Sequence, residues 1–362
     1  MILAKKCHSV ILCGIRNDAH GEQAGAGRYS MLWVLFATRN RAPILRDVLS
    51  AYGELNPVEG GWRLAIVDNG SSDGTQDVLK SFVGRLPLTI LREPRSGKNI
   101  ALNRAVEFVV SSDPTGSDMV VFTDDDTFPG PGWLAELNVA YDRHSQASIF
   151  GGSILPRWEV EPPEWILRYV PLAPVYSLTS ASAQPDGPID PRLIFGPNMA
   201  VRGHIFREGV RFDESIGPNG QSYAMGSETE LTLRLARRGA QSWFVASAVV
   251  EHFIRKEQLS RSSIMERAIR FGRGQHRLGA WRGPFNGPRW FGVPRYLWAK
   301  LAGKRVRAFQ ARLSGVEQRI FQAEWEYRFC LGEVIEARKM ALGAWTSERA
   351  DSPDAEGYEF VS

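Results

Sequence analysis

Between residues 32 and 142 the chain alternates short apolar runs with segments of helical spacing, and few folds accommodate such an alternation. Continuous apolar runs are typical of parallel strands that are covered on both faces. Repeated β-α units of about 30 residues predict an α/β fold with a mainly parallel, Rossmann-like sheet flanked by helices. The expected strands are Leu32–Ala37, Trp62–Val67, Leu88–Leu91 and Met119–Phe122, and the expected helices are Pro43–Tyr52, a segment from Ser72 or Asp73 through Phe82, Lys98–Val110 and Trp133–Asp142.

The second half of the chain has a weaker pattern. A proline-rich loop region is expected over Pro156–Pro191, and the sequence beyond Ser260 reads as mainly helical. The expected strands here are Gly151–Leu155, Phe195–Val201 and Ala246–Phe253, with an amphipathic helix over Glu228–Arg238. These features predict a disordered leader over residues 1–30, a catalytic domain over 31–260, a basic helical extension over 261–345 and a flexible tail over 346–362.

Composition excludes several classes of protein. Hydrophobic residues make up 43% and charged residues 23% of the chain, which is typical of a folded globular protein and not of a disordered one. The three cysteines have neither a disulfide framework nor zinc-ligand spacing, so we expect a reducing, cytoplasmic compartment. No uncharged apolar run reaches the roughly 18 residues that a membrane span needs.

Charge is distributed unevenly. The net charge is +4, but Arg255–Arg312 contains fifteen Lys or Arg residues and two acids, a net charge of +13. Such asymmetry indicates an anionic partner for this segment, or simply a solvated basic face. Tryptophans 281, 290 and 298 lie among these basic residues, as they do in segments that bind a membrane surface. A helical lid on the catalytic domain is an equally good interpretation, and both stay open.

Three acids, Asp124, Asp125 and Asp126, directly follow the fourth expected strand. Adjacent carboxylates repel one another unless a cation neutralises them, and ligands can bind at the carboxyl ends of parallel strands. Oxygen ligands favour Mg²⁺ or Mn²⁺. The alternative, a turn in which Asp side chains bond the local backbone, is common for isolated acids, but the position after a buried strand favours a cation site.

Three further acids and one histidine are candidates for binding or catalysis. Asp68 ends the second strand in a Gly/Ser-rich turn that a ligand can approach closely. Glu228 and Glu230 are near a helix N-terminus, and since residues two apart face different sides, one of them is expected to face a cleft. His252 lies on an apolar strand, where a structural role and a ligand role are equally reasonable.

Six motifs in a fixed order resemble family 2 glycosyltransferases, which are inverting enzymes with the GT-A nucleotide-diphospho-sugar fold. The motifs are FATRNR (36–41), VDNGSSDGT (67–75), GKNIALNRA (97–105), FTDDDT (122–127), FGPNMAVR (195–202) and GSETELTLRL (226–235). The resemblance spans about residues 32–260, roughly two-thirds of the chain. The family commonly carries a Glu-Asp pair before the last motif helix, where this chain has Ser227-Glu228.

The resemblance implies roles for individual residues. Glu228 would be the catalytic base, with Glu230 as the fallback. Asp126 would bind a metal, Mn²⁺ or Mg²⁺, together with Asp124 and His252. Asn198 and Arg202 would contact the acceptor. Donor contacts would come from Thr38, Arg39, Asn40, Asp68, Asn69, Arg95, Lys98, Asn99, Asp124 and Asp125.

The predicted function is metal-dependent, inverting transfer of a sugar, with a UDP-sugar as the expected donor. The acceptor would be a hydroxyl of a glycan or of a polyprenyl-linked molecule in surface polysaccharide or glycoconjugate synthesis. The protein would act on the inner face of the plasma membrane, where the extension could contact anionic lipid. A degenerate homologue that binds nucleotide sugars without transferring them is the main alternative. Binding of nucleic acid is not expected because it leaves Asp68 and the three acids unexplained.

Overall fold

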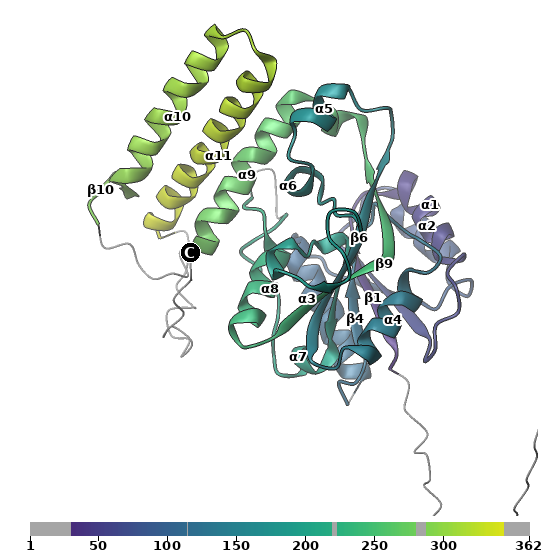
Figure 1. Cartoon of the computed structure of the whole chain (residues 1–362). Helices are drawn as coiled ribbons and strands as arrows, with labels where there is room; N and C mark the ends of the chain where they lie inside the picture. Colours follow the sequence, from purple (N-terminus) through teal and green to yellow (C-terminus); the bar gives the residue numbers. More distant parts are fainter. Residues whose placement is uncertain (1–29, 114, 219–222, 280–286, 344–362) are drawn as a thin grey trace, which may run out of the picture.

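The computed structural model describes residues 30–343, apart from residues 114, 219–222 and 280–286. Nearly all of the predicted leader and all of the predicted C-terminal tail lie outside the described residues. Figure 1 shows a sheet with helices packed around it, and a separate group of helices, α9 to α11, at one end of the molecule.

The first half of the sheet is parallel, as predicted. β1 (Leu32–Thr38) lies between β2 (Trp62–Asp68) and β4 (Met119–Phe122), and β3 (Leu88–Arg92) forms the edge beyond β2. Thr38 pairs with Asp68 in this register, so the polar ends of neighbouring strands lie at one edge of the sheet. The intervening helices are α1 (Ala42–Tyr52), α2 (Thr75–Ser81), α3 (Lys98–Ser112) and α4 (Trp133–Arg143).

The second half of the sheet is mixed. β8 (Met199–Arg202) runs antiparallel to both β4 and β6 (Ala147–Trp158), and β9 (Gln241–Ile254) runs parallel to β6. β5 (Thr127–Pro129) and the two-residue β7 (Gly187–Pro188) pair with β9 in the antiparallel sense. Within the described residues these strands form one nine-stranded sheet. The strand predicted over 195–201 starts late, because Gly196–Asn198 form a 3-10 turn around a proline.

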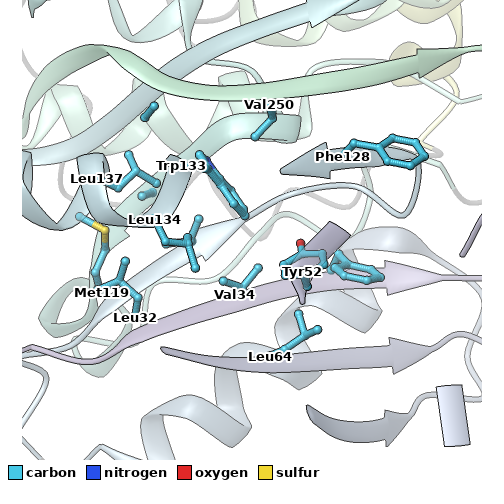
Figure 2. Close-up of a cluster of buried hydrophobic side chains, with 14 of the residues drawn as sticks. Leu32, Val34, Tyr52, Leu64, Met119, Phe128, Trp133, Leu134, Leu137 and Val250 are labelled. Atoms are coloured by element: carbon cyan, nitrogen blue, oxygen red, sulfur yellow. The ribbon is translucent and has the colours of Figure 1, made fainter. Parts of the chain in front are cut away.

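Alternating side chains of β1 build a core on each face of the sheet. Leu32, Val34 and Phe36 are buried on the face covered by α1, α2 and α4. Trp33 and Leu35 point to the opposite face, toward α3, α7 (Gly203–Arg207) and α8 (Ser227–Arg237). Figure 2 shows the first of these clusters, with Trp133 and Leu134 of α4 packed over the sheet.

The C-terminal helices pack on the rest of the chain through α9 (Arg261–Gly279). This helix lies against α11 (Glu317–Ala341), which in turn packs against α10 (Arg295–Leu313). A side chain at Gly332 would collide with the carbonyl of Ile269, so the close approach of α9 and α11 requires glycine there. The short helices α5 (Glu164–Tyr169) and α6 (Leu172–Tyr176) complete a third core with α9 and the start of α11.

Among the described helices, none combines the length and the apolar character that a bilayer span requires.

Candidate active site

A cleft of about 580 Å³ lies where the carboxyl ends of the parallel strands meet the N-termini of α3 and α8. Thr38 lines it from the end of β1, Asn69 from the turn after β2, and the three consecutive aspartates from the turn after β4. Another wall comes from α9. The fold thus gathers side chains from motifs that are far apart in the sequence, because the ends of parallel strands share one edge.

The three aspartates differ in their ionisation. Burial and the charge of Asp126 raise the pKa of Asp125 to about 7, although Arg41 opposes this effect with its Nε 3.3 Å from Oδ1. Burial also disfavours the charged form of Asp126, but His252 and Arg41 outweigh it and lower the pKa of Asp126 to about 2. The site therefore keeps Asp126 ionised, as a cation ligand must be.

The pairing of β5 with β9 brings Asp126 and His252 together. Thr127 is opposite His252 in the register, and Oδ1 of Asp126 is 3.4 Å from Nε2 of His252. Nδ1 of His252 is 2.7 Å from the carbonyl oxygen of Tyr176, which can only accept a hydrogen bond, so Nδ1 carries the proton. Burial lowers the pKa of His252, but the hydrogen bond to Asp126 and the charges of Asp126 and Asp124 outweigh burial and raise it, which favours the protonated ring with its Nε2–H directed at Asp126. Loss of this proton frees the Nε2 lone pair for a cation, and a carbonyl partner for the Nδ1–H is usual for metal-binding histidines.

Asp126 and His252 fit a divalent ion that takes its remaining ligands from a bound substrate. In the described part of the chain, no three His, Cys, Asp or Glu side chains are grouped as a complete metal site. Asp124 is engaged by Lys98, whose Nζ is 2.5 Å from its Oδ1. One carboxylate and one imidazole remain, and Mg²⁺ and Mn²⁺ sites of this type take further ligands from phosphate oxygens and water.

Glu228 faces the same cleft from the first turn of α8. Its Oε1 is 3.0 Å from Nζ of Lys98, and its Oε2 accepts a hydrogen bond from the hydroxyl of Ser227 at 3.0 Å. Burial raises the pKa of Glu228, but Lys98 and Ser227 outweigh burial, and the net pKa lies below its ordinary value. A Cβ at Gly196 would be 2.5 Å from Oε1 of Glu228, so glycine there leaves room for this carboxylate.

Nine of the residues predicted from the sequence line the cleft. Lys98 was expected to contact the donor. In the structure its ammonium group forms ion pairs with both Asp124 and Glu228. Asn69 also supports the cleft wall, since its side chain bonds the backbone of Glu93, Arg95 and Gly97. The nine are Thr38, Arg39, Asn69, Lys98, Asp124, Asp125, Asp126, Glu228 and His252.

The structure places Glu230, the residue expected as the fallback base, outside the cleft. Its side chain is fully buried, outside the cleft, and ion-paired with Arg234 one turn further along α8, with 2.9 Å between Oε1 and Nε. The two glutamates of this helix therefore point to different surroundings, as helical geometry requires. Glu228 faces the cleft and Glu230 faces the core.

The two residues predicted to contact the acceptor, Asn198 and Arg202, also lie outside the cleft lining. Asn198 is buried and bonds the indole of Trp133 and the carbonyls of Ser153 and Ala248. Arg202 donates to three backbone carbonyls, those of Tyr141, Ala147 and His144. Both side chains connect α4 to strands of the sheet through hydrogen bonds, and neither lines the cleft.

Four predicted donor residues lie outside the cleft lining. Asp68 accepts hydrogen bonds from the Ser71 amide and from Gln76, and Arg95 pairs with Glu93. The side chain of Asn40 accepts a hydrogen bond from the amide of Ser72. The side chain of Asn99 donates hydrogen bonds to the carbonyls of Asp213 and Ile216. These side chains fix the loops that carry the lining residues.

Four arginines of the cleft were not predicted from the sequence. Arg41 follows the predicted Thr38–Asn40 and pairs with Asp125. Arg255, Arg267 and Arg270 line the wall formed by the end of β9 and by α9. The charge run of the extension was visible in the sequence, but nothing in it showed which members face the cleft, because that depends on how α9 packs.

Comparisons with known proteins agree with this arrangement. A glucosyl-dolichyl phosphate glucuronosyltransferase of Haloferax volcanii is 24% identical over 120 residues, 33% of this chain and 37% of that protein, so the chain matches just over a third of that relative's length. The mannosyltransferase PcManGT from Pyrobaculum calidifontis, solved with GDP-Man and Mn²⁺, superposes with a TM-score of 0.55 at 18% identity, covering 86% of this chain and 88% of that one. Residues 1–349 of TarS from S. aureus cover 87% of this chain and 92% of that one, at 11% identity and a TM-score of 0.47.

The likeness to PcManGT shows that the fold is GT-A. Residues 33–199 match the family described as Glycosyl transferase family 2, a stretch that contains β1 to β6 and the three consecutive aspartates. Over this stretch the chain is similar to glycosyl transferase family 2.

Proposed function

We propose that this protein is a metal-dependent, inverting glycosyltransferase that moves a sugar from a nucleoside-diphosphate sugar to a hydroxyl of a glycan or lipid-linked acceptor. The observation that carries the proposal is the presence, in one cleft, of the Asp126–His252 pair and of an ionised Glu228. The relatives support it: one is named for a dolichyl phosphate-linked acceptor, and another was solved with GDP-Man and Mn²⁺. We keep UDP as the first nucleotide to test, with GDP beside it, and synthesis of surface polysaccharide or glycoconjugate as the setting.

In this mechanism Glu228 acts as the base. Its ionised carboxylate would accept the proton of the acceptor hydroxyl while that oxygen attacks the anomeric carbon, an effect typically worth about 10²–10⁴-fold. Lys98 holds the carboxylate in place through its 3.0 Å contact. A divalent ion held by Asp126 and His252 would stabilise the negative charge of the leaving diphosphate as a Lewis acid. A single displacement from the side opposite the diphosphate inverts the anomeric centre.

Binding of nucleotide with Mn²⁺ tests the metal assignment. We expect Asp126→Ala to abolish the Mn²⁺-dependent rise in melting temperature that UDP or GDP gives, since a ligand is lost. The fold should survive, because the substitution also relieves repulsion with Asp125. Asp77→Ala on the exposed side of α2 is the matched control and should behave like the wild type. Unchanged nucleotide affinity with Mn²⁺ in Asp126→Ala contradicts the assignment.

The degenerate-homologue alternative makes a different prediction. A protein that binds nucleotide sugars without transferring them would show the Mn²⁺-dependent shift but no release of free sugar or nucleotide. We expect slow donor hydrolysis with Mn²⁺, measured as release of the nucleoside diphosphate, because water can replace the acceptor hydroxyl. Binding without any hydrolysis or transfer, across a panel of donors, supports the alternative.

We further propose that α10 lies on an anionic membrane surface. Val306, Phe309 and Leu313 form a stripe along its outer face and are 56%, 62% and 74% exposed. The opposite face of the helix packs on α11 through Leu297 and through the Lys304–Glu326 and Lys300–Glu333 ion pairs. Figure 1 shows α10 as the outermost helix of this group, with α11 and α9 between it and the sheet.

The charge around the stripe favours lipid as its occupant. Arg305, Arg307 and Arg312 lie on the same helix, with no acid between Arg295 and Leu313. Two copies of so basic a face would repel each other, whereas apolar residues flanked by arginines suit an anionic bilayer surface. The placement would also bring the protein to a lipid-linked acceptor.

Sedimentation with vesicles tests this membrane proposal. The wild type should sediment with vesicles that contain phosphatidylglycerol, and be released as salt rises to 1 M, where the screening length is about 3 Å. Phe309→Asp combined with Leu313→Asp should abolish sedimentation. Val83→Asp, which alters an equally exposed side chain outside the extension, should not. Equal sedimentation with neutral vesicles, or self-association that the double variant removes, contradicts the proposal.

A further inference from the structure

One face of α9 forms a wall of the cleft that also contains the three aspartates. Its side chains follow helical spacing and present two arginines, an aromatic ring and two neutral polar groups. Arg255, at the end of β9, adds a third arginine to this wall. We call Arg255, Arg267 and Arg270 the arginine wall. The α9 residues that line the cleft are Ser263, Arg267, Arg270, Phe271 and Gln275.

The acids of the cleft already have cationic partners on their own side. Arg41 is 3.3 Å from Asp125 and 3.8 Å from Asp126, and Lys98 contacts both Asp124 and Glu228. Within the described ranges, six Lys or Arg side chains and four carboxylates line the cleft. The excess positive charge therefore belongs to the arginine wall.

Among the three arginines of the wall, Arg267 gives the strongest evidence for a bound ligand. Its Nε is buried, and no group in the described part of the chain accepts a hydrogen bond from it. A buried donor without a partner costs stability unless a ligand supplies the acceptor. Burial lowers the pKa of Arg267, and the charge of Arg270 lowers it further, so an anion at this position would relieve both effects.

Arg270 and Arg255 extend the same surface. Arg270 reaches Glu266 on the exposed side of α9, and its guanidinium carbon is 5.2 Å from the centre of the Tyr223 ring, itself a lining residue. Arg255 forms no salt bridge with any residue between 30 and 343 that the structure describes, although its charge acts on Asp126. Guanidinium groups match the geometry of phosphate oxygens and bind them in pairs of hydrogen bonds.

We propose that the arginine wall binds a phosphate group of the acceptor, in addition to the diphosphate of the donor. This inference rests on the proposed transferase function and makes the acceptor substrate a phosphate-bearing molecule. The donor diphosphate belongs beside Asp126 and His252, where a divalent ion would offset its charge. The arginine wall then still carries excess positive charge, which a second phosphate balances.

Binding of farnesyl phosphate, with farnesol as the uncharged control, tests the inference. Isothermal titration of the whole chain is done with and without saturating UDP and Mn²⁺. We expect farnesyl phosphate, but not farnesol, to bind while UDP and Mn²⁺ are present. Arg267→Met should weaken this binding about tenfold or more, and Arg267→Lys should restore part of it. Arg261→Met, which removes a cation of α9 that lies outside the cleft lining, should leave it unchanged.

The arms of this experiment separate the two sources of phosphate. Competition between UDP and farnesyl phosphate, or loss of UDP binding in Arg267→Met, assigns the wall to the donor and overturns the inference. Absence of farnesyl phosphate binding, or equal binding of farnesol, overturns it as well. Binding of UDP with Mn²⁺ in the wild type, measured in the same titrations, shows separately whether the donor site of the proposed transferase exists. Melting curves of the Arg267 variants confirm that they are folded.

Discussion

At the scale of single residues, Lys98 joins the two carboxylate groups of the site. Its ammonium contacts Asp124 from the turn after β4 and Glu228 from the start of α8. Burial disfavours its charge, but the two carboxylates outweigh burial and raise its pKa. The charged lysine in turn keeps Glu228 ionised, which base catalysis at neutral pH requires.

Replacing Glu228 separates its role from that of its neighbour on α8. Glu228→Gln keeps the shape and cannot take a proton, so kcat should fall about 10²-fold or more, with nucleotide binding nearly unchanged. Glu228→Asp should retain partial activity. Glu230→Gln should instead lower stability, since it leaves Arg234 beside a buried neutral group. Steady-state kinetics and melting curves of the three variants check this, and full turnover in Glu228→Gln contradicts the mechanism.

Gly196 offers an independent test of the position of Glu228. A methyl group at this glycine would overlap Oε1 of Glu228, so Gly196→Ala should displace the carboxylate from its place beside Lys98. We expect kcat to fall at least several-fold while UDP binding with Mn²⁺ persists. Gly303→Ala, at a glycine of α10 with no neighbouring atoms around the added carbon and no left-handed backbone, is the comparison for a general effect of alanine. Equal activities of the two variants would show that the carboxylate tolerates displacement.

At the scale of elements, two pairings assemble the site. β5 is three residues long, yet its antiparallel register with β9 sets His252 beside Asp126. α9 and α11 are held together by Glu336, which is fully buried and bonded to Arg273 at 2.7 Å and also to Arg277. This pairing fixes the helix that carries the arginine wall.

The ion pairs of Glu336 predict how stability depends on pH. Burial raises the pKa of Glu336, but hydrogen bonds from Arg273 and Arg277 outweigh it, and the net pKa lies below the ordinary value of 4.5. A lowered pKa in the folded state contributes stability above about 4.5 that is lost as the pH falls through the folded value. Glu336→Gln should therefore cost about 3–5 kcal/mol at pH 7.

Urea unfolding of Glu336→Gln and of the wild type at pH 7 and at pH 3.5 measures this effect. The difference in unfolding free energy should shrink at the lower pH, because below about 4.5 the Glu336 carboxyl of the unfolded wild type takes up a proton, which favours unfolding. Glu333→Gln, which alters the partly exposed partner of Lys300 on the same helix, should show a smaller cost at pH 7. A difference that is the same at both pH values would assign the loss to packing.

At the scale of the whole molecule, the cleft lies between two contributions of unlike charge. The turn after β4 and the N-terminus of α8 supply the acids, and α9 supplies arginines from the basic C-terminal part. The extension was expected to be either a lid or a membrane element. In the structure α9 forms a wall of the cleft, while α10 presents an exposed apolar stripe. The lid interpretation therefore concerns α9, and the membrane interpretation, which stays a proposal, concerns α10.

The local sequence was sufficient to predict most of the fold. Apolar runs such as Leu32–Ala37 bury both faces of a strand wherever they are placed, and helical spacing defined α3 and α8 to within a few residues. The three aspartates after β4 could be assigned to a cleft because parallel strands end at one edge. The strand at β8 was predicted, but its antiparallel direction was not, because direction depends on pairing with β4 and β6. The three-residue β5 left no signal, since so short a strand is too brief for a pattern.

By itself, then, the sequence determined the strands, most helices and the motifs whose backbone turns end at the cleft. The tertiary structure decided which side chains of those motifs face it. Asn198 and Arg202 belong to a motif beside the site, yet their side chains bond strands and α4. Lys98 contacts Asp124, which is 26 positions further along the chain. The arginine wall lines the same cleft from the end of β9 and from α9. Local periodicity sets the backbone, whereas the direction of a side chain in space depends on packing between elements that no local pattern encodes.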